Sequence, residues 1–340
     1  MTTPSVFEPA ALSFYLPRTQ KKNPVPKNPI HEKLAHTSSW PGSRFVTPCL
    51  VVASSFFIHS ATFGLVILVT GCAATPQTSK LETHSTDTMT PIVIGRSFVM
   101  DSAVLGEKRT ITVYLPDDYK EGTKRYPILY LLDGGADEDF HHITGIVQVS
   151  VANGLMEPIV VIGVKNTIRR RDMTGPTTNP TDLDRGKDVG GSAAFRSFLK
   201  TELIPRIDRD FRGNGERTLM GESLAGLFVV ETFLDQPDMF HRYIAVSPSL
   251  WWNNGMLLKN AAERLTALPV PGKTFYLAVG GIEDNTKEAE RFAESLRQSS
   301  PQGLAWYYEP LPMEAHGTML HAAALRALRK FFPAKPHEKP

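Results

Sequence analysis

Residues 217–230 decide the fold of this chain, and their sequence is Arg-Thr-Leu-Met-Gly-Glu-Ser-Leu-Ala-Gly-Leu-Phe-Val-Val. Apolar residues before Gly221 predict a short strand, and the apolar run that starts near Leu224 predicts a helix. Ser223 lies between them, two residues after Gly221 and two before Ala225. This spacing is typical of a nucleophile elbow, G-x-S-x-G, in which a strained strand-to-helix turn exposes a serine hydroxyl. The helix N-terminus also brings backbone N–H groups to the place where an oxyanion would form.

The match to the elbow pattern is incomplete, because Ala225 stands where the pattern has its second glycine. A second interpretation is therefore open, in which Ser223 only caps a buried helix after an ordinary glycine turn. A five-residue motif is a hypothesis until its structural context supports it, so the rest of the chain has to decide.

The composition of the 340 residues is that of an ordinary globular protein, with 41% hydrophobic residues and a net charge of +2. Nucleic-acid binding would require a concentrated basic face, which this balance does not support. The sequence contains no GxxxxGK[ST] loop, CxxC pair or HExxH motif, so we expect no cofactor and no metal. The two cysteines, Cys49 and Cys72, both precede the predicted domain, which excludes a cysteine nucleophile there.

The first 90 residues are predicted to lie outside the folded domain. Residues 1–44 are basic and rich in Pro, Ser, Thr and Lys, and such a segment buries too little apolar surface to fold. Residues 45–72 form an apolar run that ends at Cys72, and residues 73–90 form a polar linker. The catalytic domain is predicted over residues 91–335.

The apolar run allows two modes of export. Val69-Thr-Gly-Cys72 resembles a bacterial lipobox, in which Cys72 carries the lipid and everything before it is removed. Alternatively, the run spans a bilayer as an uncleaved anchor, with its basic flank inside. Signal peptides have about 15–30 residues, so a lipoprotein would require a start further downstream. Both alternatives predict an exported, membrane-attached protein that faces the periplasm or the cell exterior.

The remaining chain predicts an α/β domain with a doubly wound, mostly parallel sheet. Alternating residues at 93–100 and 108–115 predict antiparallel strands at its start. Continuous apolar runs are typical of parallel strands that are covered on both faces. These runs are 128–132, 159–164, 218–220, 244–247 and 275–279, and residues 306–310 are the expected final strand. Residues with helical spacing lie between them, at 195–207, 224–234 and 291–296.

Functional residues of such a sheet lie at the carboxyl ends of its strands. Here these ends carry polar residues or glycine, namely Asp133, Lys165, Glu222, Ser247 and Gly280. A domain without a site would not need this clustering, which favours the elbow interpretation.

Five segments between about residues 94 and 332 resemble the putative-esterase branch of the α/β-hydrolases. They are Tyr126-Pro-Ile-Leu-Tyr-Leu-Leu-Asp-Gly134, Asn166-Thr-Ile-Arg-Arg-Arg-Asp-Met-Thr174, Phe198-Leu-Lys-Thr-Glu-Leu-Ile-Pro-Arg-Ile207, Gly221-Glu-Ser-Leu-Ala-Gly-Leu227 and Ser247-Pro-Ser-Leu-Trp-Trp252. The likeness is strongest to the siderophore trilactone esterases of the enterobactin and salmochelin type. The sequence departs from the family pattern at Ala225, at Glu222 (often His in the family) and at an inserted Gly175.

The catalytic triad of α/β-hydrolases follows the chain order serine, acid, histidine. Ser223 is the expected nucleophile, and His316 is the expected base because it follows the last predicted strand in a loop. The acid should follow the strand at 275–279, where Glu283 and Asp284 are adjacent. Family spacing implies Glu283, with Asp284 left to cap the next helix, but the choice between them stays open.

The oxyanion is expected to bind the backbone N–H groups of Leu224 and Gly135. Arg171 is a candidate contact for an anionic or catechol-bearing substrate, although a structural ion pair is an equal alternative. Trp251 and Trp252 are candidates for the wall of an aromatic acyl pocket, or for ordinary packing.

The sequence thus predicts a serine carboxylic-ester hydrolase that acts through an acyl-enzyme on a small-molecule ester and resembles the siderophore esterases. The alternatives are an acyltransferase of the mycolyltransferase type, a feruloyl or acetyl-sugar esterase, and a non-catalytic binding module.

Overall fold

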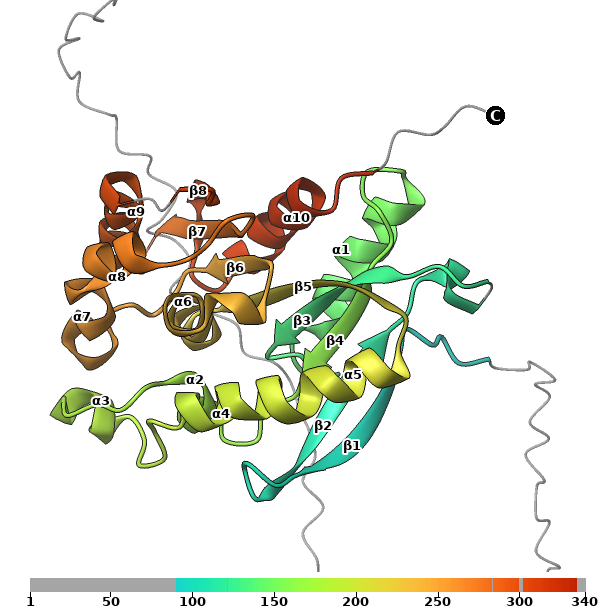
Figure 1. Cartoon of the computed structure of the whole chain (residues 1–340), viewed down its shortest axis with the longest axis horizontal. Coiled ribbons are helices and arrows are strands. Elements are labelled where there is room, and N and C mark those ends of the chain that lie inside the picture. The colour runs from blue at the N-terminus through green and yellow to red at the C-terminus, as the bar shows by residue number, and fades with distance from the viewer. Residues whose placement is uncertain (1–89, 121, 283, 300–301, 335–340) are drawn as a thin grey trace, which may run out of the picture. The chain divides into compact units, whose positions relative to one another are not determined.

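The computed structural model describes residues 90–120, 122–282, 284–299 and 302–334 (Figure 1). The predicted segments 1–44 and 45–72, Cys72 and nearly all of the linker 73–90 lie outside these residues. At the centre is one sheet of eight strands in the order β1-β2-β4-β3-β5-β6-β7-β8. The pairs β1–β2 and β2–β4 are antiparallel and all others are parallel, which confirms the predicted α/β-hydrolase architecture.

The strands are β1 (Arg96–Ser102), β2 (Glu107–Tyr114), β3 (Tyr126–Leu132), β4 (Val160–Val164), β5 (Gly213–Glu222), β6 (Arg242–Val246), β7 (Thr274–Ile282) and β8 (Ala305–Ala315). The helices are α1 (Phe140–Ala152), α2 (Arg169–Met173), α3 (Pro180–Asp184), α4 (Ser192–Phe198), α5 (Ile204–Asp210), α6 (Leu224–Asp235), α7 (Trp252–Lys259), α8 (Ala261–Ala267), α9 (Thr286–Ser299) and α10 (Met319–Phe331).

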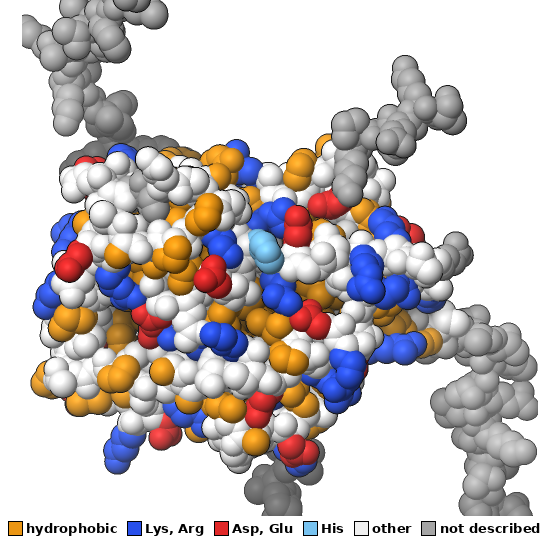
Figure 2. Space-filling model, in the orientation of Figure 1, with side chains coloured by type: hydrophobic (Ala, Val, Ile, Leu, Met, Phe, Trp, Pro, Cys, Tyr) orange, Lys and Arg blue, Asp and Glu red, His pale blue; other side chains and the backbone are white. Residues whose placement is uncertain are grey.

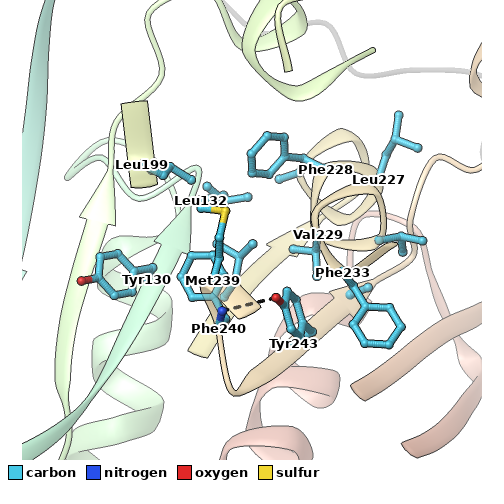
Figure 3. Packing of buried hydrophobic residues seen from close by; sticks show 14 of the residues in the cluster. Tyr130, Leu132, Leu199, Leu227, Phe228, Val229, Phe233, Met239, Phe240 and Tyr243 are labelled. Carbon is cyan, nitrogen blue, oxygen red and sulfur yellow. Dashed lines mark hydrogen bonds between the residues drawn. The ribbon is translucent and has the colours of Figure 1, made fainter. Parts of the chain in front are cut away.

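Helices cover both faces of the sheet, so most residues of its central strands are buried. Helices α4, α5, α6, α8 and α9 pack on one face, and α1 and α10 lie together on the other (Figure 1). Every residue of β3 and β4 is buried, as continuous apolar runs in parallel strands require. Figure 3 shows the first of these layers, where Phe228 and Phe233 of α6 and Tyr243 of β6 lie in one cluster with Leu132 of β3.

The helix that the sequence predicts over 195–207 is interrupted. Helices α4 and α5 are joined by a π-helical turn, Leu199–Leu203, directly before Pro205. Proline has no N–H to donate to the preceding turn, and its ring crowds that turn, so the helix widens locally. The sequence pattern predicts no element at α1, because β-branched residues such as Ile143 and Val147 weaken the helical signal there.

Charged side chains of both signs are interspersed with apolar ones on the face of the molecule shown in Figure 2. Among the described residues, no helix is long and apolar enough to cross a membrane.

Candidate active site

Ser223 occupies a strained turn between β5 and α6. Its backbone angles are φ 60° and ψ −118°, in a region that residues other than glycine rarely adopt. A Cβ on Gly221 would lie 2.7 Å from the Cβ of Ala225, so the methyl group of Ala225 fits because Gly221 has no side chain. A Cβ on Gly226 would lie 2.8 Å from the carbonyl oxygen of Val246. The elbow therefore has the shape that the pattern predicts, with Ala225 accommodated.

The structure brings Ser223 and His316 together, although they are far apart in the sequence. His316 Nε2 lies 3.1 Å from Ser223 Oγ, and His316 Nδ1 lies 2.8 Å from Asp284 Oδ1. The three residues follow the carboxyl ends of β5, β7 and β8. In the sheet, β7 and β8 are neighbours, and β6 lies between β5 and β7. This is the order serine–histidine–acid in which an imidazole can take a proton from a hydroxyl while a carboxylate orients it.

The carboxylate beside His316 belongs to Asp284, so the sequence-based choice of Glu283 is corrected by one residue; Glu283 itself lies outside the described residues. Strand β7 continues to Ile282, beyond the predicted end at 279. The Asp284 carboxylate then accepts the backbone N–H of Gly280, so the chain turns back over the strand end. The carboxylate of Asp284 is thus bonded to both His316 and the backbone of Gly280, and its side chain is fully buried.

Electrostatics at the site favour an ionised acid and a basic imidazole. Burial opposes ionisation of Asp284, but hydrogen bonds from His316, Ser247 and backbone N–H groups outweigh it and bring its pKa to about 2. The hydrogen bond to Asp284 raises the pKa of His316 above its ordinary 6.5, against the effect of burial. Burial, followed by the charge of Asp139, raises the pKa of Glu222 to about 7.

The loop after β3 is tied to the loop after β4 through Asp133. Arg169 Nε and Nη2 donate to the two carboxylate oxygens of Asp133 at 2.7 and 2.6 Å, and Asn166 Nδ2 donates to Asp133 Oδ1 at 2.6 Å. Arg169 Nη2 also lies 3.3 Å from the carbonyl oxygen of Glu222, the residue before the nucleophile. Of the arginines at positions 169–171, Arg169 is thus the one whose guanidinium borders the nucleophile.

The two predicted oxyanion donors differ in their surroundings. Leu224 is the first residue of α6, so its N–H has no carbonyl partner within the helix. The N–H of Gly135 instead donates to Glu138 Oε2 at 2.7 Å. The second predicted donor is therefore occupied by a side-chain carboxylate in this structure.

Arg171 does not line the site, which corrects its prediction as a substrate contact. Its guanidinium donates to Glu107 at 2.7 and 3.0 Å and to Asp172 at 2.8 Å. Asp172 in turn pairs with the completely buried Arg109 at 2.6 Å. The alternative of a structural ion pair is the one that the structure supports, because these bonds tie α2 to β2.

We expect Arg171→Ala to lower the melting temperature, because Glu107 and the buried Asp172 each lose a charged hydrogen-bond donor, at a cost of about 1–3 kcal/mol. Its effect on KM should be equal for anionic and neutral esters. Thermal unfolding and kinetics with one ester of each kind check this, with Arg169→Ala as the matched variant at the edge of the site. A selective rise in KM for the anionic ester in Arg171→Ala would contradict the structural assignment.

The two tryptophans have different environments. Trp252 is only 4% exposed, and its indole N–H donates to the carbonyl oxygen of Gly175 at 2.9 Å. It packs between α6 and the segment before α3, beside a cavity of about 240 Å³ that no candidate catalytic residue lines. Trp251 is partly exposed, and the guanidinium of Arg185 lies 4.6 Å from its ring. Trp252 is thus a packing residue, and only Trp251 stays a candidate substrate contact.

Two further hydroxyls lie at the site, both from Ser-Pro-Ser after β6, and no catalytic role was predicted for either of them from the sequence. Ser247 Oγ lies 2.8 Å from His316 Nδ1, and Ser249 Oγ lies 3.3 Å from Ser223 Oγ. The polar end of β6 was the available signal. Within the described part of the chain, no three His, Cys, Asp or Glu side chains are grouped as metal ligands would be.

The fold and the serine–histidine–aspartate arrangement define a serine hydrolase of the α/β-hydrolase class. The model of the family described as Putative esterase matches residues 102–308. The chain belongs to this family, and it is a hydrolase that acts on carboxylic ester bonds.

Its relatives include two siderophore esterases. The ferri-bacillibactin esterase BesA of Bacillus subtilis is 32% identical in a match that covers 62% of this chain and 81% of the relative. The apo-salmochelin esterase of Escherichia coli is 29% identical, over 60% of this chain and 68% of the relative. Among solved structures, an IroE-like serine hydrolase from Shewanella oneidensis has a TM-score of 0.65 and 26% identity, over 70% of this chain and 80% of that one. These similarities confirm the prediction of an ester hydrolase that resembles siderophore esterases.

Proposed function

We propose that Ser223, His316 and Asp284 form the catalytic triad of this esterase. The observation that carries the proposal is the pair of distances from His316 to Ser223 and to Asp284, on a strained elbow. Ser223 Oγ forms a bond to the ester carbonyl carbon while its proton passes to His316 Nε2. Collapse of the tetrahedral intermediate breaks the bond to the alcohol oxygen, which leaves with that proton. Water then repeats the sequence on the acyl-enzyme and releases the acid.

In this mechanism the N–H of Leu224 stabilises the oxyanion, because the start of α6 gives it a free donor. The N–H of Gly135 is the second donor in the proposal. When substrate binds, this N–H has to release Glu138 and donate to the oxyanion instead. Catalytic hydrogen bonds often form or tighten only in the substrate complex.

We further propose that the substrate is a siderophore ester of the trilactone type. The bacillibactin and salmochelin esterases among the relatives support this class. The guanidinium of Arg169, beside the Glu222 carbonyl, and the partly exposed ring of Trp251 are suitable contacts for an anionic or aromatic acyl group. A mycolyl-type acyltransferase would use the same triad, and so would a feruloyl or acetyl-sugar esterase.

A substrate panel tests this proposal. The purified protein would be given trilactone siderophores with and without iron, feruloyl esters and acetylated sugars, with products measured by mass spectrometry. We expect the highest kcat/KM for a trilactone, with the free acid as product. A preference for feruloyl esters would replace the proposed substrate. An acylated alcohol as the main product in the presence of an acceptor would instead indicate an acyltransferase.

The pH dependence follows from the raised pKa of His316. The imidazole must be neutral to accept the serine proton, so kcat/KM for a neutral ester should rise with pH through a midpoint above 6.5. Ionised Glu222 contributes to that shift. Glu222→Gln should therefore move the midpoint to lower pH, which a pH–rate profile measures. A midpoint that stays unchanged in Glu222→Gln would show that the two groups are not coupled.

We also propose that the protein is exported and attached to a membrane through Cys72, with a single-pass anchor over residues 45–72 as the alternative. The support is the lipobox-like sequence at Val69–Cys72. Cells that express the protein and are fed labelled palmitate should incorporate label into the wild type but not into Cys72→Ser. Label in neither protein, with residues 1–71 still present in the intact mass, would favour the anchor.

A further inference from the structure

Ser247 follows β6 in a backbone conformation that is unfavourable for serine. Its φ is 41°, and the residue is completely buried. Glycine adopts such an angle at little steric cost, whereas a side chain there stores strain of about 1–3 kcal/mol. A strained, buried serine beside a reaction site raises the question of what its hydroxyl does.

Three polar groups surround this hydroxyl. Ser247 Oγ donates to Asp284 Oδ1 and lies 2.8 Å from His316 Nδ1. Asn285 Nδ2 donates to the carbonyl oxygen of Ser247 at 3.0 Å and to Ser247 Oγ at 3.3 Å. The hydroxyl is therefore in contact with both the acid and the imidazole of the proposed triad, and the amide of Asn285 holds it from the other side.

The direction of these bonds determines which ring nitrogen of His316 carries the proton. The single hydroxyl proton of Ser247 is directed to Asp284, and the amide of Asn285 can only donate from its nitrogen. Two atoms face His316 Nδ1, namely Asp284 Oδ1 and Ser247 Oγ. Both thus present lone pairs to it. Two acceptors around Nδ1 favour the tautomer with the proton on Nδ1, which leaves the lone pair on Nε2 toward Ser223.

We propose that Ser247 is a positioning residue, which acts through Asp284 and His316 to hold the imidazole in the tautomer and orientation that can accept the proton of Ser223. This inference rests on the proposed triad. It assigns to Ser247 no contact with substrate. The strain at φ 41° is the cost of keeping a hydroxyl where glycine would fit more easily.

The test compares Ser247→Ala and Ser247→Gly, which both remove the hydroxyl but differ in backbone strain. We expect kcat to fall by about 10- to 100-fold in both, by analogy with the loss found when the hydrogen-bond partners of metal-ligating histidines are removed. KM should change little. NMR of protein with ¹⁵N-labelled histidine should show His316 as the Nδ1–H tautomer in the wild type and as a mixture in both variants. Ser150→Ala is the matched control, because Ser150 is also a completely buried serine and its hydroxyl accepts a bond from Arg329 in α10.

The outcomes separate this inference from the proposed function. If Ser247→Ala keeps the wild-type kcat, or if kcat recovers only in Ser247→Gly, Ser247 is not a positioning residue. The proposed esterase function would still stand. If Ser247→Ala does not fold, kcat and the His316 tautomer in Ser247→Gly decide. A wild-type protein that hydrolyses no ester and does not react with a fluorophosphonate would instead refute the proposed triad.

Discussion

Replacement of Ser223 by alanine is expected to lower kcat for ester hydrolysis by about 10⁶-fold, the loss found when the nucleophile of a serine hydrolase is removed. The hydroxyl is the only group at the elbow that can form the acyl-enzyme, and His316 Nε2 lies 3.1 Å from it. Steady-state kinetics with an activated phenyl ester measure the loss. A variant that keeps more than a few per cent of the wild-type rate would contradict a serine mechanism.

The fold of this variant should stay intact. Among the described residues, the partners of Ser223 Oγ are the side chains of His316 and Ser249, so its loss should cost no more than about 1 kcal/mol. Ser223→Gly is the matched control, because glycine tolerates φ 60°. It should be equally inactive, and its melting temperature should be at least that of Ser223→Ala. Circular dichroism and thermal unfolding check both variants.

Asp284→Asn should have the second-largest effect, a loss of about 10⁴-fold in kcat. An amide cannot support the imidazolium that forms when His316 takes the proton, and it can leave the ring in the wrong tautomer. KM should change far less than kcat, since Asp284 is fully buried and is bonded to His316, Ser247 and the backbone of Gly280. Single-turnover kinetics that separate acylation from deacylation would show that acylation is slowed in Asp284→Asn.

Glu283→Gln is the variant that separates the two neighbouring acids. It should keep near wild-type kcat, because the carboxylate beside His316 is that of Asp284. If Glu283→Gln is the inactive variant and Asp284→Asn is active, the acid is Glu283 and the arrangement at the end of β7 differs from that described.

Much of this architecture could be predicted, because it depends on local patterns. Continuous apolar runs located the parallel strands, and the order of polar strand ends located Ser223 and His316 at one edge of the sheet. The small residues Gly221 and Ala225 predicted the elbow, and the contact between them explains why alanine is tolerated.

The remaining features depend on where individual side chains point, which spacing does not determine. Spacing alone does not separate Glu283 from Asp284, whereas the extension of β7 to Ile282 and the contact with His316 single out Asp284. The role of Arg171 was set by Glu107, a residue of β2 that only the folded sheet brings near. Ser247 was recognised only as a polar strand end, because the contacts of its hydroxyl form only when the ends of β6, β7 and β8 meet.

The most direct test of Ser223 as the nucleophile is to locate the covalent adduct that a fluorophosphonate forms with the protein. The protein would be treated with a fluorophosphonate, digested with trypsin and analysed by tandem mass spectrometry, with Ser223→Ala treated in parallel. We expect a stoichiometric adduct on peptide 218–242, in which Ser223 is the single serine, and none in the variant. An adduct on the peptide that contains Ser247 and Ser249, or an unmodified protein that still hydrolyses esters, would contradict it.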